Sequence, residues 1–81
     1  MIDRDLARLM LISGFRSARE LNELLFVLKE HCSADDYERL RGKIADAIAE
    51  INAATLSEAF DAHPDLHAEV DATIKKYGRF S

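Results

Sequence analysis

The 81-residue sequence has few of the residues that cross-link, break or loop a chain, with one cysteine, one proline and three glycines. The single cysteine, Cys32, cannot close an internal disulfide, so the sequence does not fit a small disulfide-stapled secreted domain. We therefore expect a cytoplasmic protein. The glycines are isolated from one another, which leaves no glycine-rich loop to bind a phosphate group.

The sequence also lacks an excess of positive charge and a long apolar run. Its 11 Lys and Arg residues stand against 15 Asp and Glu residues, for a formal net charge of -4. Such a charge does not attract nucleic acid or an anionic membrane, so neither is the expected partner. The apolar stretch near the N-terminus is too short for a signal peptide or a membrane-spanning helix.

What the sequence does contain is typical of a globular helical protein. It is 48% hydrophobic and 32% charged, a balance that excludes disorder and low-complexity repeats. No stretch alternates apolar and polar residues as a half-buried strand does, whereas apolar residues recur at spacings of three and four. A chain of this length buries only about 60% of its unfolded surface, so additional burial against a partner is plausible.

The N-terminal third predicts a short antiparallel hairpin of two helices. Asp3 is placed to cap a helix over residues 4–13, and Gly14 to end it in a left-handed turn. Ser17 stands three residues before Glu20, the spacing at which the two side chains satisfy free amides at a helix start. A second helix is therefore expected over residues 18–31.

The remainder predicts one long helix and a shorter one that folds back. Ser33 can cap a helix over residues 34–60, which at 1.5 Å per residue would be about 40 Å long and overhang a compact chain about 30 Å across. Pro64 is expected to begin the last helix, over residues 64–77, with Gly78 as its cap. The predicted fold class is all-α, a small bundle of three to four helices.

The first two predicted helices have more apolar surface than a hairpin interior needs. Leu11, Ile12, Phe26 and Val27 lie about 100° or more from the main apolar stripes. Either the later helices cover these side chains or a second subunit does, and we favour the second subunit. The predicted function is thus a non-enzymatic helical interaction or regulatory module, either a homodimer or a small subunit of an assembly, with these four residues as its interface.

The two histidines four residues apart in "DAHPDLHAEVD" raise the alternative of a metal- or pH-responsive protein. His63 and His67 would share a face only if Asp61 caps the last helix and both histidines are helical. Proline pushes the preceding residue out of the helical region, which favours a corner at His63 and two imidazoles that point apart. We therefore expect neither a metal nor any other cofactor, and His63 and His67 remain the candidates should both prove helical.

Two further functions have partial support in the sequence. The expected turn at Gly14 between two helices matches a helix-turn-helix, which makes a small DNA-associated regulator the alternative function. It is not the favoured function, because the second helix offers acids and buried leucines rather than hydrogen-bond donors for DNA. The basic and aromatic tail at residues 75–80 could stack on single-stranded nucleic acid or dock on the protein. His31 beside Cys32 has no third group to orient it, and we expect no enzyme activity.

Overall fold

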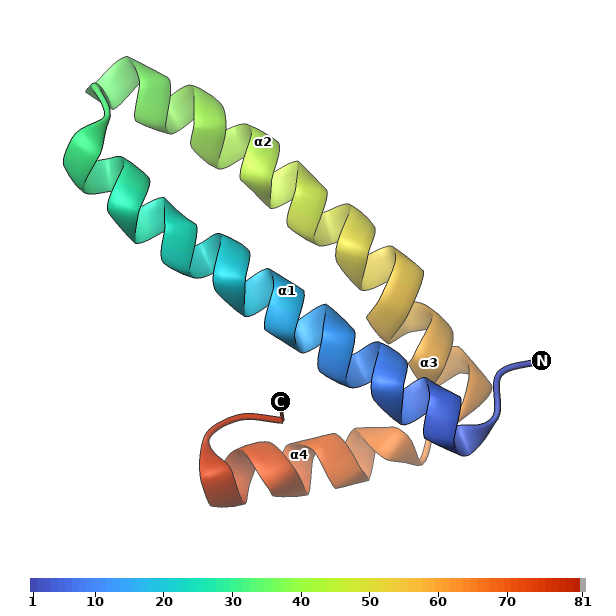
Figure 1. Ribbon diagram of the computed structural model, residues 1–81. Coiled ribbons are helices and arrows are strands. Elements are labelled where there is room, and N and C mark those ends of the chain that lie inside the picture. Colours follow the sequence, from blue (N-terminus) through green and yellow to red (C-terminus); the bar gives the residue numbers. More distant parts are fainter. Residues whose placement is uncertain (81) are drawn as a thin grey trace.

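The computed structural model describes residues 1–80, which form helices and no β-strand (Figure 1). The prediction of an all-α fold is confirmed. In chain order the elements are α1 (Arg4–His31), α2 (Ala34–Asn52), the π-helical turn η1 (Ala53–Ser57), α3 (Glu58–Ala62) and α4 (Leu66–Tyr77). Helices α1 and α2 form a long antiparallel hairpin, and α4 folds back beside the start of α1 (Figure 1).

The predicted break between residues 13 and 18 is wrong, because α1 runs through it as one helix of 28 residues. Gly14 is helical rather than left-handed, and Gly78 is the only described residue with a positive φ. Small and apolar residues recur in heptad spacing straight through the supposed turn: Ala7, Leu11, Gly14, Ala18, Leu21, Leu25, Leu28. Such spacing keeps one face of α1 toward a neighbouring helix, which outweighs the local capping signal. The short hairpin is therefore replaced by the longer one of α1 and α2.

Gly14 lies at a close approach between α1 and η1. A methyl group at this position would collide with the hydroxyl of Thr55 and lie 3.1 Å from Cδ2 of Leu56. The Thr55 hydroxyl donates a hydrogen bond to the carbonyl of Ile51 at 2.6 Å, a bond that often accompanies distorted helices. The glycine is thus explained by packing and not by a turn.

The second arm of the hairpin follows the prediction of a helix over residues 34–60. Ser33 caps it by accepting a hydrogen bond from the amide of Asp36 at 3.2 Å. Helical backbone then continues through α2, η1 and α3 to Ala62. The π-helical turn, which inserts a wider backbone loop in the middle of this path, was not predicted.

Helix α4 begins at Leu66, two residues later than predicted, because Pro64 and Asp65 form a turn. The amide of Leu66 donates to the carbonyl of His63 at 3.0 Å, which closes that turn. At the other end, Gly78 has φ 79° and its amide donates to the carbonyl of Ile74 at 2.7 Å. The predicted glycine cap is confirmed.

The buried core occupies only the base of the hairpin, where α1, α3 and α4 meet. Its members are Ala7, Leu11, Ala59, Leu66 and Val70. The molecule measures 44 × 28 × 14 Å along its principal axes. Its radius of gyration is 14.8 Å, against about 12 Å for a compact chain of this length. The expected overhang is present, and both long helices take part in it (Figure 1).

Polar contacts hold α4 against the base of α1. Arg8 donates to both carboxylate oxygens of Glu69, from Nε at 2.8 Å and from Nη2 at 2.9 Å. Arg4 pairs with Asp65 in the turn before α4. The hydrogen bonds from these arginines hold the pKa of each carboxyl group below its ordinary value. After α4, the chain returns to α1, where the rings of Phe15 and Phe80 lie 5.9 Å apart.

Candidate interaction surface

The outer part of the hairpin has no core of its own. We define the distal hairpin as residues 18–32 of α1 and 34–51 of α2, and none of these residues is buried. Its apolar side chains are half-buried along both helices: Leu21, Leu25 and Leu28 on α1, and Tyr37, Leu40, Ile44, Ile48 and Ile51 on α2. Two helices touch along a single line, so the flanks of each apolar stripe stay open to solvent.

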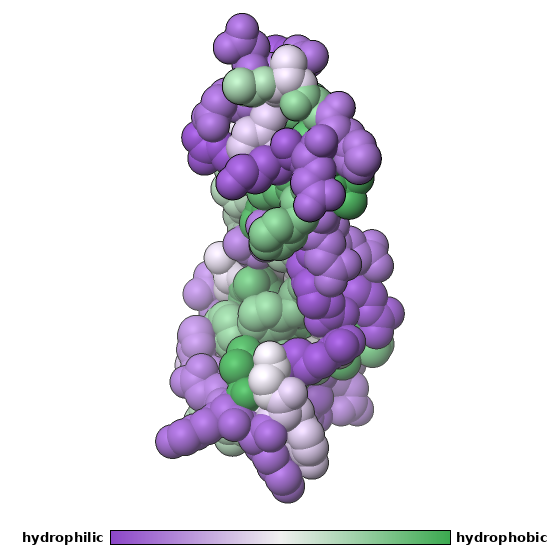
Figure 2. Space-filling model, turned by 90° about the vertical axis from the view of Figure 1, so that its left-hand side faces the viewer, coloured by the Kyte–Doolittle hydropathy of each residue, from purple (hydrophilic) through white to green (hydrophobic). Residues whose placement is uncertain are grey.

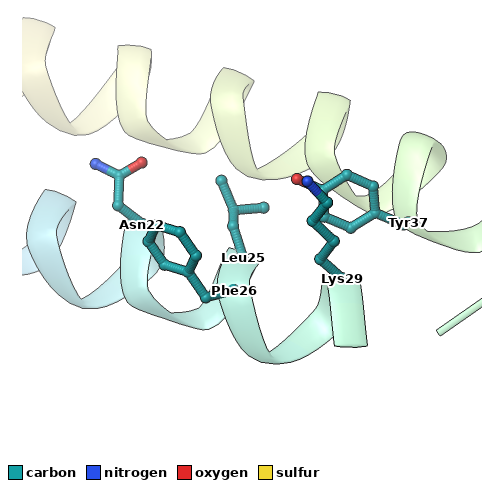
Figure 3. Close-up of a pocket in the computed structure, with 5 residues that line it drawn as sticks. All are labelled: Asn22, Leu25, Phe26, Lys29 and Tyr37. Atoms are coloured by element: carbon teal, nitrogen blue, oxygen red, sulfur yellow. The ribbon is translucent and has the colours of Figure 1, made fainter. Parts of the chain in front are cut away.

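One open flank forms a groove between the two helices. It encloses about 310 Å³ and is lined by Asn22, Leu25, Phe26, Lys29 and Tyr37. Leu25 points toward α2, Asn22 lies at one end of the groove, and Lys29 and Tyr37 close the other end (Figure 3). The groove is apolar along its floor and polar at its ends, which is the pattern of a surface that receives an apolar side chain.

Large apolar side chains stand out beside this groove. Phe26 is 73% exposed, Val27 54% and Leu24 42%. Figure 2 shows apolar surface as a broken band that continues up the molecule between polar margins. Exposed apolar patches rimmed by polar residues mark interaction surfaces more often than isolated apolar residues do.

The predicted interface residues separate into two groups in the structure. Leu11 is wrong as an interface residue, because it is fully buried in the core at the base. Ile12 is half-buried, whereas Phe26 and Val27 are exposed as expected of contact residues. The burial of Leu11 depends on the docking of α4 onto α1, which helix periodicity alone does not specify.

Part of the surface was missed from the sequence. Asn22, Lys29 and Tyr37 line the groove with Phe26 but were not predicted to take part in it. Tyr37 is the first apolar residue of the α2 stripe and follows soon after the turn at Ser33, so pairing α1 with α2 would have placed it opposite the end of α1. The incorrect break at Gly14 hid this pairing.

The structure does not bring His63 and His67 together as a ligand pair. His63 lies outside the helices, with φ −139° and ψ 79°, and its Nε2 is 3.0 Å from the carbonyl oxygen of Ile2. His67 stacks on Phe60, with the ring centroids 3.7 Å apart. The predicted corner at His63 is therefore present. Among residues 1–80, no group of three or more His, Cys, Asp or Glu side chains is placed to hold a metal ion.

The other candidates lose the geometry on which they depended. Because α1 is continuous past Gly14, the helix-turn-helix expected there is absent. In the tail, Phe80 packs on Phe15, while Tyr77 stays exposed beneath the ammonium group of Lys76. Within residues 1–80, no helix is long and apolar enough to cross a membrane.

No protein-family model, curated protein or solved structure matches the chain. The function therefore has to be inferred from the distal hairpin itself.

Proposed function

We propose that the chain is a non-enzymatic helical interaction module that acts as a homodimer through its distal hairpin. The observation that carries the proposal is the absence of any buried residue between positions 18 and 51, although apolar side chains recur along both helices there. Apolar side chains contribute to stability in proportion to the surface that is removed from water. A second pair of helices laid on the distal hairpin would supply the missing burial.

The accessible surface agrees in size with one subunit of a dimer. The chain exposes 5658 Å². A compact monomer of 9.1 kDa would expose about 4900 Å². The surplus is therefore about 750 Å², close to the roughly 800 Å² that each partner buries in a protein interface of standard size.

The character of the surface also supports association. Phe26 is the most exposed aromatic residue of the distal hairpin and lies at the edge of the groove. Aromatic anchors beside such pockets carry a large share of the binding energy in many interfaces.

Sedimentation equilibrium tests the proposal. We expect a mass of twice 9.1 kDa at a chain concentration of about 100 µM, and dissociation on dilution. Phe26→Asp should weaken the dimer roughly 30-fold or more, as expected of a hot-spot residue.

The matched control is Tyr77→Asp, since Tyr77 is similarly exposed at 67% but lies on α4, outside the distal hairpin. This variant should dimerise like the wild type. A chain that remains monomeric at about 100 µM, or equal weakening by both substitutions, would contradict the proposal.

A further inference from the structure

A second hollow adjoins the groove at the tip of the hairpin. It encloses about 360 Å³ and is lined by Lys29, Cys32, Ala34, Tyr37 and Glu38. Lys29 and Tyr37 line both the groove and this second hollow, and in Figure 3 they close the groove at the end that faces the tip. The groove therefore has an apolar floor and one end at which a lysine and a tyrosine meet a bound molecule.

The polar groups at this end of the groove have no partners within the chain. Among residues 1–80, no ion pair involves Lys29 and no hydrogen bond involves the hydroxyl group of Tyr37. No carboxylate lines the groove itself. In the second hollow the carboxylate of Glu38 is already paired with Arg41, at 2.8 Å. The groove thus offers a bound molecule one ammonium group and one hydroxyl group.

These groups are complementary to an apolar chain that ends in a carboxylate. The ammonium group and the phenolic hydroxyl group both donate hydrogen bonds, and a carboxylate accepts from both. Leu25 and the exposed ring of Phe26 favour an apolar group beside it. Small-molecule sites combine a mostly apolar lining with a few polar groups that fix the orientation of the ligand. A fatty acid has the matching distribution of charge and apolar surface.

The distance along the groove sets the length of the chain that fits. Asn22 and Lys29 lie at its two ends, and seven residues of helix advance about 10 Å. An extended chain of carbon atoms joined by bonds of about 1.5 Å spans this distance with about eight atoms. A fatty acid of about eight carbons should therefore fill the groove, whereas a longer chain extends past Asn22 into solvent.

We propose that the groove binds a free medium-chain fatty acid, whose carboxylate accepts hydrogen bonds from Lys29 and Tyr37 and whose chain lies on Leu25 and Phe26. The proposal goes beyond the homodimer and does not depend on it, because all the residues of the groove belong to one chain. The groove lies on the surface proposed for dimerisation, so a bound fatty acid and a second copy compete for it.

A titration with octanoate, followed by the amide chemical shifts of the chain in NMR, tests the proposal. The dissociation constant should be about 1 mM, as expected of a small ligand in an open groove, and the largest shifts should fall within residues 22–37. Each methylene group removed from octanoate should weaken binding about two- to fourfold. Chains longer than about eight carbons should gain little further affinity, since the groove is then filled.

Octylammonium, a cation with the same chain, is the matched control ligand. The net charge of the chain is -4, which by itself favours the cation. Octanoate should nevertheless bind at least about threefold more tightly, because Lys29 attracts the carboxylate and repels the ammonium group. A preference for the anion on an acidic protein would thus come from the groove and not from the overall charge.

Lys29→Gln should weaken octanoate binding about three- to fivefold and abolish the preference for the anion. Lys29 is exposed, so the variant should retain the wild-type helicity, which circular dichroism checks. The control Lys43→Gln removes an exposed lysine that does not line the groove, and it should bind octanoate as the wild type does.

Three results would overturn the proposal: no binding of octanoate at about 10 mM, equal affinity in the wild type and Lys29→Gln, or shifts spread evenly along the chain. Each of them would leave the homodimer standing, since sedimentation tests dimerisation without the fatty acid. A chain that stays monomeric and still binds octanoate at the groove would overturn the homodimer alone.

Discussion

Replacement of Gly14 by alanine distinguishes two opposing effects on the free energy of unfolding, the cost of a tighter helix contact and the gain in helix propensity. Alanine is favoured over glycine in a helix interior by about 1 kcal/mol. At Gly14, however, the added methyl group would meet Thr55 and Leu56 across the contact between α1 and η1. Overpacking of a tight contact costs about 1–3 kcal/mol.

The net effect of Gly14→Ala should therefore lie between no change and a loss of about 2 kcal/mol in the free energy of unfolding. For a domain of this size, a loss of about 2 kcal/mol lowers the midpoint of thermal unfolding by roughly 8–16 °C. Gly42→Ala is the matched control, because Gly42 also lies inside a helix but nothing stands within 4 Å of a methyl group there. Gly42→Ala should raise the free energy of unfolding by about 0.5–1 kcal/mol.

Thermal unfolding followed by circular dichroism, with all variants at one concentration, measures both effects. Combining Gly14→Ala with Thr55→Ala should recover part of the loss, because the second substitution removes the hydroxyl that the methyl group would meet. A Gly14→Ala variant as stable as Gly42→Ala would refute the packing of α1 on η1.

One further prediction concerns α4. Hydrogen bonds from arginines lower the pKa of Asp65 and Glu69 below their ordinary values of 3.8 and 4.5. The ion pairs that dock α4 therefore contribute their full stability above the ordinary pKa values, and this stability is lost as the pH falls through the lowered pKa values. The protection factors of the α4 amides, which are corrected for the intrinsic pH dependence of exchange, should fall between about pH 5 and pH 3, and fall less in Glu69→Gln. Protection factors that do not change over this pH range would contradict this.

The local signals in the sequence were reliable wherever a single side chain decides the backbone. Asp3 caps α1 by accepting a hydrogen bond from the amide of Leu6 at 2.8 Å, and Gly78 closes α4 in the left-handed conformation. Pro64 forces the corner at His63 through its steric effect on the preceding residue. These features depend on contacts within a few residues and can be predicted from the sequence.

The error at Gly14 arose because a local signal competed with a longer one. A glycine followed by Ser17 and Glu20 is a common helix boundary, yet the heptad spacing from Ala7 to Leu28 continues unbroken across it. The deciding contact is between Gly14 and Thr55, 41 positions away in the chain. Such a contact is specified by the packing of two helices, and the sequence on either side of each residue does not indicate it.

The interaction surface was only partly predictable, because some of its features depend on helix periodicity and others on which helices pack together. The exposure of Phe26 and Val27 follows from their angle on the helix, which periodicity gives directly. The burial of Leu11 and the groove beside Tyr37 depend on which helices pack together. Once the hairpin of α1 and α2 is known, the groove beside Tyr37 follows from the distance along each arm. The burial of Leu11 follows only when the docking of α4 onto α1 is also known.

Hydrogen exchange at two protein concentrations tests most directly whether the distal hairpin is the buried surface of a dimer. At about 1 µM, where dilution should have dissociated the dimer, amides of residues 21–48 should exchange faster than those of residues 7–14, the segment that contributes Ala7 and Leu11 to the core. At about 100 µM the amides of residues 21–48 should gain protection while those of residues 7–14 change little. Protection of residues 21–48 that is the same at both concentrations would contradict the account.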